Sequence, residues 1–338
     1  MTNPVLVEAL RGGIVESRHR GSIVVSDGDG GIVVEIGDID QPVFSRSAIK
    51  AIQALPLVES GAADAYGFGD KEIALACASH SGEQAHTETA RSMLRAAGLE
   101  PAVLECGWHW PFGQDATVAL ARDGGAPSAL HNNCSGKHSG FVCTCVHQGV
   151  DPAGYVGRNH AAQQWVREAM ETVTGAAHGE DMCGIDGCSI PAYAVPLRSL
   201  AHGFARLATG AGLSPARATA ARRIVSACMK EAFYVAGTGR ADTRLMTIGA
   251  RRVFTKTGAE GVFCAAVPEL GLGIALKCDD GATRAAEVMI AAILARLMRD
   301  DPELSARIAE LAVPTLTNWN GMEVAALRPA GELAPQPT

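Results

Sequence analysis

The chain has 338 residues, enough for one large domain or two closely packed ones with a sizeable core. It carries 29 Lys and Arg against 36 Asp and Glu, and this net charge of −7 lacks the basic surplus of proteins that bind nucleic acid generally. Hydrophobic residues make up 47% and charged residues 19%, which excludes a largely disordered chain.

The N-terminal segment and the most apolar stretch do not resemble export or membrane signals. The opening residues, MTNPVLVEALRGG, contain no basic segment followed by an apolar one, so we expect no secretory signal. The stretch 285–298 contains Glu287 and Arg296 and is too short to cross a bilayer. We therefore predict a cytoplasmic protein with no membrane partner, in which most of the ten cysteines are reduced.

The N-terminal part alternates like a β-meander, and the pattern then becomes helical. Strands are predicted over 14–16, 22–26 and 31–36, with a turn at 27–31. Helices are predicted over 47–57, 71–78, 84–97, 137–148, 161–174, 190–209 and 216–232.

Strand character returns after Arg244. Three short strands are expected there, with turns at Gly249, 258–261 and 269–271, and an apolar helix follows over 282–298. The tail 331–338 is expected to fray.

This order predicts an α/β (α+β) fold. One antiparallel sheet is built from both termini, residues 1–50 and 244–338, and is flanked by helices. A mainly helical subdomain, 51–243, is inserted between the two halves. We expect the functional site at the junction of the two parts.

Ser47 and Lys50 form an S-x-x-K motif at a predicted helix start. Residues i and i+3 share a helix face, so the lysine amine is expected to reach the serine hydroxyl. A serine needs a base to become a good nucleophile, and a lysine serves only if its pKa is lowered by burial or a nearby positive charge. The motif alone is weak because it arises by chance in many chains.

Two further segments strengthen the motif. Ser79 lies in the loop Ser79–Gly82 after an apolar helix, and Lys256 opens a K-T-G sequence at the end of a strand. The order S-x-x-K, serine loop, K-T-G is that of penicillin-recognising serine enzymes. Two lysines that converge on one site lower each other's pKa, which would leave a neutral amine available as a base.

The motifs also resemble a more specific family, the inducible, thermolabile, zinc-containing L-asparaginases of rhizobial type. The matching segments are Phe44–Pro56, Ala78–Glu83, Asn132–His138, Gly184–Cys188 and Lys256–Gly261. The resemblance runs from about residue 10 to 300 and implies a serine β-lactamase-like fold. It also implies hydrolysis of L-asparagine to L-aspartate and ammonia, and a homodimer.

The resemblance implies catalytic roles for two serine–lysine pairs. Ser47 would be the nucleophile with Lys50 as its base, and Ser79 with Lys256 would handle proton transfer to the leaving ammonia. The oxyanion of the intermediate needs preorganised N–H donors, expected here from the backbones of Ser47 and Ala259.

Substrate contacts are expected from three more side chains. Arg46 suits the α-carboxylate because a guanidinium can bind a carboxylate in a bidentate manner. Asp186 could accept the α-ammonium or hold a metal-bound water. His80, beside Ser79, is a further candidate, although a solitary histidine without an adjacent acid is more often structural.

Two thiol-bearing segments have the polar, turn-like sequence of a metal site. Zinc prefers thiolate and imidazole, so spacing alone favours Cys134, His138 and either Cys188 or Cys183. The remaining thiols, such as Cys143, lie in apolar sequence and are expected in the core.

The family resemblance implies a different ligand set, Cys134, Lys137 and Cys188 with a water, and leaves His138 as the second choice. A lysine ligand must lose its proton, which the charge of the metal favours. We expect one Zn²⁺ per chain, with a structural or substrate-positioning role.

Other functions remain open at this point. A glutaminase is the nearest, because a pocket discriminates one methylene by only ~1–3 kcal/mol. A β-lactamase or peptidoglycan peptidase would act outside the cytoplasm and has no need of the thiol group. A non-catalytic zinc- or amino-acid-binding protein is a different class, and it would have no reason to keep both serine–lysine pairs.

Overall fold

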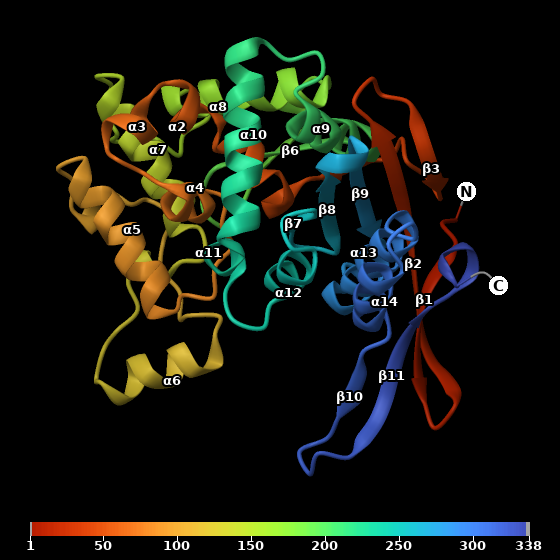
Figure 1. Ribbon diagram of the computed structural model, residues 1–338. Coiled ribbons are helices and arrows are strands. Elements are labelled where there is room, and N and C mark those ends of the chain that lie inside the picture. Colours follow the sequence, from red (N-terminus) through yellow and green to blue (C-terminus); the bar gives the residue numbers. More distant parts are fainter. Residues whose placement is uncertain (1, 336–338) are drawn as a thin grey trace.

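The computed structural model describes residues 2–335. Within them, an antiparallel eight-stranded sheet forms one side of the molecule, in the order β10-β11-β1-β2-β9-β8-β7 with β3 paired to β2 (Figure 1). The strands are β1 (Val5–Arg11), β2 (Ile14–Asp27), β3 (Ile32–Ile36), β7 (Phe254–Thr257), β8 (Val262–Val267), β9 (Leu272–Cys278), β10 (Thr315–Thr317) and β11 (Glu323–Pro329). All of them come from the two ends of the described chain.

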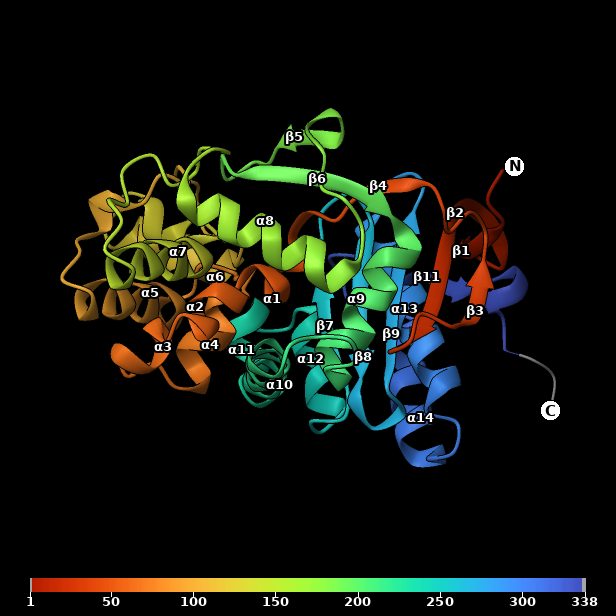
Figure 2. The same ribbon diagram turned by 90° about the horizontal axis from the view of Figure 1, so that it is seen from above.

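In the sequence, most helices lie between the N-terminal strands β1–β3 and the strands β7–β9 of the large sheet. They are α1 (Lys50–Gln53), α2 (Leu55–Glu59), α3 (Ala62–Ala65), α4 (Asp70–Ala76), α5 (Gln84–Ala96), α6 (Gln114–Arg122), α7 (Ser135–His147), α8 (Ala161–Thr174), α9 (Leu197–Thr209), α10 (Pro215–Lys230), α11 (Ala232–Ala236) and α12 (Ala241–Ile248). Two more, α13 (Thr283–Leu297) and α14 (Pro302–Ala309), follow β9. A small sheet, β4 (Pro42–Phe44), β6 (Pro191–Pro196) and β5 (Cys183–Ile185), runs across one face of the molecule (Figure 2).

The centre of the large sheet is buried on both faces. Ile23, Val24 and Val25 of β2 have no exposed surface and pair with β3 and β9. Helix α9 packs on β2 and β9, and α13 packs on β8 and β9. A continuous apolar run is typical of such a doubly covered strand, whereas alternation is typical of a half-exposed one.

Two glycines let helices approach their neighbours closely. A Cβ on Gly273 of β9 would lie 2.1 Å from the Ala201 carbonyl oxygen of α9. A Cβ on Gly136 of α7 would lie 2.3 Å from the Leu75 carbonyl oxygen of α4. Only glycine fits at these distances. The second contact matters for function, because it sets α7 against the helix that leads into the Ser79 loop.

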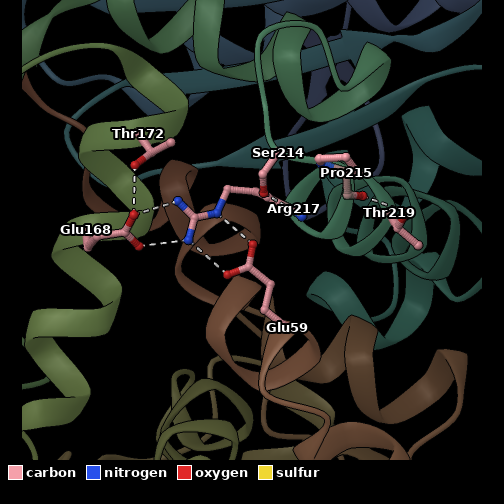
Figure 3. A network of polar contacts seen from close by, with 7 residues as sticks. All are labelled: Glu59, Glu168, Thr172, Ser214, Pro215, Arg217 and Thr219. Atoms are coloured by element: carbon pink, nitrogen blue, oxygen red, sulfur yellow. Dashed lines mark hydrogen bonds and ion pairs between the residues drawn. The ribbon is translucent and has the colours of Figure 1, made fainter.

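An arginine ties three helices of the helical part together. Arg217 of α10 binds Glu59 of α2 at 2.6 Å and Glu168 of α8 at 2.7 Å (Figure 3). Thr172 donates a further hydrogen bond to Glu168. The Arg217 side chain is only 13% exposed, so this network is less weakened by solvent than an isolated surface pair.

The fold class predicted from the sequence is confirmed. The structure is a mixed α/β fold with an antiparallel sheet from both termini and a mainly helical insertion. Helix 161–174 is found with its expected bounds, and the strands that return after Arg244 are β7, β8 and β9. None of the helices in residues 2–335 has the length and apolar character needed to cross a membrane.

Two helix predictions were wrong in part. Residues 191–196 form strand β6, because alternating Tyr193 and Val195 are buried against partners in β4 and β5 that are distant in sequence. The helix expected over 47–57 is divided into a 3-10 turn, Arg46–Ile49, then α1 and α2. Pro56 is the second residue of α2 rather than the end of a helix, because proline lacks the N–H that the first helical turn leaves unpaired.

The tail also differs from expectation where it is described. Residues Gly331–Leu333 form a 3-10 turn, and Leu333 is buried. Residues 336–338 of the segment expected to fray lie outside the described residues.

Candidate active site

The expected catalytic residues come from three separate elements that meet beside β7, an edge strand of the large sheet. Ser47 lies in the 3-10 turn that leads into α1, Ser79 follows α4, and Lys256 belongs to β7. Gly258, after β7, lies so close to this turn that a Cβ there would be 3.0 Å from the Ser45 carbonyl oxygen. The glycine of K-T-G therefore lets the strand end approach the turn that carries Ser47.

Two lysines share the hydroxyl of Ser79. The Lys50 Nζ lies 2.9 Å and the Lys256 Nζ 3.0 Å from the Ser79 Oγ. All three side chains are at least 95% buried. Two amines on one hydroxyl, shielded from water, form a short path along which a proton can move.

Ser47 differs from Ser79 in its contacts and exposure. It is half-buried, and its hydroxyl has no hydrogen-bond partner within residues 2–335. The expected contact with Lys50 is not formed, because its Nζ instead makes hydrogen bonds with the Ala78 carbonyl, the Ser79 hydroxyl and the Cys134 thiol. Ser47 thus presents an accessible hydroxyl without a hydrogen bond, beside the buried lysines.

Burial controls the charge of Lys256. It lowers the pKa of this amine from 10.5 to about 7, with help from the positive charges of Lys50 and Arg240 and against the opposing charge of Asp242. A large fraction of Lys256 is therefore neutral near pH 7. A neutral amine can accept a proton, as the sequence argument required.

Asp242 is a buried residue of the site that sequence reasoning missed. Its Oδ1 accepts a hydrogen bond from the Thr257 N–H of K-T-G at 2.6 Å, while its Oδ2 has no partner in the described chain. It lies in the first turn of α12, in a segment for which the sequence predicted neither a helix nor a strand. The carboxylate holds the end of β7 in place.

Removing the Asp242 carboxylate is expected to destabilise the fold. Asp242→Ala would leave the buried Thr257 N–H without an acceptor and should lower the free energy of unfolding by about 1–3 kcal/mol. Asp242→Asn keeps an acceptor oxygen and should lose less. Denaturant unfolding measures both, with Asp64→Ala on the surface as the control. A loss in Asp242→Ala no larger than in Asp64→Ala would contradict this role.

The candidate metal residues also come together. The Lys137 Nζ lies 3.1 Å from the Cys188 Sγ, and the Cys134 Sγ lies 3.1 Å from the Lys50 Nζ. The charges of Lys50 and Lys137 act on both Cys134 and Cys188, so both thiols and the Lys137 amine form one buried group. Cys183 instead directs its thiol to the Gly184 carbonyl.

The environment of this group favours one thiolate, at Cys134, whereas the hydrogen bond with Cys134 and burial raise the pKa of Cys188. The hydrogen bond with Cys188 and the charges of Lys50 and Lys137 hold the pKa of Cys134 well below its usual value, despite burial. Burial opposes a charge on Lys137, but the two thiols outweigh it and raise its pKa. The donor set of two sulfurs and one nitrogen fits zinc, whose binding would release protons from these groups.

His138 and His80 are both fully buried. The His138 Nδ1 lies 2.7 Å from the Tyr155 hydroxyl, and its Nε2 is without a partner in the described chain. His80 accepts the Gly82 N–H on Nδ1, so its Nε2–H donates to the Ser135 hydroxyl. Burial keeps the pKa of both imidazoles well below the usual value, so both are neutral. His80 thereby ties the Ser79 loop to α7.

Arg46 and Asp186 form an ion pair at the site. The Arg46 Nε and Nη2 lie 2.9 and 2.8 Å from the Asp186 Oδ1. Arg46, at φ 47°, and Ser189, at φ 74°, both adopt the left-handed region that non-glycine residues avoid. Such strain persists only where surrounding contacts enforce it and is concentrated at functional sites.

Ala259, the other expected oxyanion donor, lies in the exposed turn after K-T-G. Its N–H makes no hydrogen bond with residues 2–335, and its carbonyl accepts from Val262. An unpaired N–H beside the turn that holds Ser47 is available to a ligand.

Comparison with known proteins defines the class. Residues 7–329 match the family model described as L-asparaginase II, so the chain is an amidohydrolase. It belongs to the L-asparaginase II family. No curated relative matches the sequence.

Among solved structures, the chain is similar to Mglu, at 17% identity and a TM-score of 0.37, over 84% of this chain and 67% of that one. It is also similar to a beta-lactamase, Mb2281c from Mycobacterium bovis, at 12% identity and a TM-score of 0.42. That match covers 83% of this chain and 94% of the other. An Mglu structure in its L-glutamate binding form matches at 17% identity and a TM-score of 0.37, over 88% of this chain and 63% of that one.

Proposed function

We propose that this amidohydrolase is an L-asparaginase, which hydrolyses L-asparagine to L-aspartate and ammonia through an acyl-enzyme on Ser47. The observation that carries the proposal is the accessible Ser47 hydroxyl beside a buried Lys50–Ser79–Lys256 chain. Membership of the L-asparaginase II family supports the choice of substrate.

The steps follow from the positions of these groups. The Ser47 oxygen attacks the side-chain amide carbon of asparagine. Its proton passes to Lys50, which turns toward Ser47 and gives one of its own protons through the Ser79 hydroxyl to the neutral Lys256 amine. The Ser79 hydroxyl, shared by both lysines, then returns a proton to the departing nitrogen, so the C–N bond breaks and ammonia leaves. Water attacks the ester by the same route in reverse and releases aspartate.

Backbone and charged groups would hold the substrate. The N–H groups of Ala259 and Ser47 stabilise the oxyanion, because donors fixed in advance cost no reorganisation during reaction. Arg46 takes the α-carboxylate and Asp186 the α-ammonium, so a zwitterion replaces the ion pair that these residues form with each other.

The substrate is tested by ammonia release from L-asparagine and L-glutamine. We expect kcat/KM for asparagine to exceed that for glutamine at least about tenfold, since one methylene changes binding by ~1–3 kcal/mol. The reverse preference would make the chain a glutaminase. Turnover of neither amide by folded, zinc-replete protein would favour the non-catalytic binding protein.

We also propose that Cys134, Lys137 and Cys188 bind one Zn²⁺. Two thiols and an amine gathered in a buried group match the ligand preference of zinc, and His138 is near in sequence as the second choice. When bound, the metal would supply a fixed positive charge that orders the pocket. The serine–lysine groups account for proton transfer without it. The homodimer and the cytoplasmic location stay predictions from the sequence.

Loss of one thiol is expected to abolish zinc binding. Cys188→Ser should reduce zinc from about one equivalent per chain to below about a tenth, measured by elemental analysis after dialysis. Cys183→Ser is the matched control, because this thiol lies in the same hairpin but contacts a backbone carbonyl. Zinc lost from Cys183→Ser and kept by Cys188→Ser would contradict the assignment.

A further inference from the structure

A cavity lies next to the proposed active site, and of its lining only Arg46 has a role in the proposed mechanism. Its volume is about 390 Å³, within the range of small-molecule sites. It lies between the segment that carries β4 and the ends of β8 and β9. Its lining comprises Thr2, Asn3, Gln41, Pro42, Val43, Phe44, Arg46, Glu260, Val262, Lys277 and Asp279. Of the proposed catalytic and substrate residues, Arg46 alone belongs to it.

The cavity contains both signs of charge without an ion pair between them. Within residues 2–335, Lys277 forms no ion pair and donates only to the Cys278 carbonyl, and the Glu260 carboxylate has no hydrogen bond. Asp279 accepts a hydrogen bond from the Asn3 amide at 2.9 Å. Lys277 and Glu260 therefore remain without an ion-pair partner, Asp279 keeps one carboxylate oxygen without a hydrogen bond, and the fourth charged group, Arg46, is paired with Asp186 outside the lining.

Apolar side chains form the rest of the wall. Pro42, Val43, Phe44 and Val262 provide surface that a short side chain could contact. A cation, carboxylates and a small apolar wall together match a ligand with one carboxylate and one ammonium on a compact frame.

We propose that this cavity binds a free α-amino acid as its zwitterion. Lys277 holds the carboxylate, and Glu260 with Asp279 holds the ammonium. The ligand class follows from the unpaired charges of opposite sign, because a simple anion would face the two carboxylates and a simple cation would face the lysine.

The cavity also adjoins both expected oxyanion donors. An effect of the bound ligand on catalysis is inferred from this, and that inference rests on the proposed function. Arg46 directly precedes Ser47, and Glu260 directly follows Ala259. Arg46 and Glu260 adopt φ values of 47° and 57°. A ligand that displaces either strained residue moves an N–H of the oxyanion site, so occupancy of the cavity changes kcat.

Equilibrium dialysis with radiolabelled L-aspartate tests the site. The wild type should bind two equivalents per chain, one at the active site and one in the cavity. Lys277→Met and Glu260→Gln should each weaken the second site at least about tenfold, since charge-assisted hydrogen bonds are lost. Lys230→Met, an exposed lysine on α10, is the control and should keep both sites.

The outcomes separate this site from the proposed function. If the active site does not bind aspartate, the wild type binds one equivalent and Lys277→Met binds none, which still supports the cavity. Binding that is equal in the wild type and in both cavity variants overturns it. Addition of L-aspartate at saturating asparagine should change kcat of the wild type and not of Lys277→Met. An unchanged wild-type kcat overturns the coupling.

Discussion

Replacing Ser47 with alanine is expected to lower kcat/KM for asparagine at least about 10⁴-fold, the scale seen when a nucleophile is removed. Ser47 is the accessible hydroxyl of the site, whereas Ser79 is 5% exposed and bound by two amines. A substrate amide can reach the former without displacing either lysine. Ammonia release by the purified variant measures the loss.

Ser79→Ala is the matched variant for this experiment. If Ser79 relays protons, its loss should slow turnover about 10²–10⁴-fold, the range of general acid–base catalysis, while Ser47 can still be acylated. Mass spectrometry of quenched reactions should then find an aspartyl adduct on Ser47 in Ser79→Ala. An adduct on Ser79 in the Ser47→Ala variant would show instead that Ser79 is the nucleophile and Ser47 the proton relay.

Lys256→Met is expected to inactivate the enzyme and yet to stabilise its fold. Activity should fall about 10²–10⁴-fold, because a base in the proton path is lost. The same lysine is fully buried with its pKa lowered to about 7, so its charged form is disfavoured in the folded state. Methionine fills a similar space without a charge to bury.

The pH dependence has a defined sign. The unfolded pKa is 10.5 and the folded pKa about 7, so between these values the unfolded chain binds one proton more. Wild-type stability should therefore rise with pH through this window, and the cost of the buried charge is complete below pH 7. The advantage of Lys256→Met should be largest below pH 7 and shrink as pH rises.

Denaturant unfolding across this pH range measures the effect. The difference between wild type and Lys256→Met isolates the one residue, because other titrating groups are common to both. Lys230→Met, an exposed lysine that pairs with Asp70, serves as the control and should change stability by less than about 1 kcal/mol. A difference that does not vary with pH would show that Lys256 is not buried with a lowered pKa.

The motifs marked most of the site, but one contact expected between them is not formed. Helical spacing predicted that Lys50 reaches Ser47, whereas its amine points to the Ser79 loop. The spacing rule describes which residues share a helix face, but a long side chain turns to whichever acceptors the tertiary structure provides. Those acceptors are Ala78, Ser79 and Cys134, all from other elements.

Asp242 and the cavity beside the proposed active site illustrate what local patterns miss. An aspartate in polar sequence predicts a surface residue, yet Asp242 is fully buried, and its carboxylate accepts the Thr257 N–H of the strand that follows, β7. Likewise, Lys277 and Glu260 are unremarkable in sequence. They share a cavity because the end of β9 and the turn after β7 lie on the same side of the sheet.

The sequence by itself determined the class of fold, the family and the residue types of the chemistry. Hydrophobic periodicity is a local property of the sequence. The order of the motifs along the chain likewise does not depend on how the chain packs. Only the tertiary structure decided which groups touch: Ser79 between two lysines, Lys137 against Cys188, and β6 as a strand. Each of these depends on partners distant in the chain, whose positions follow from burial of the core and not from neighbouring residues.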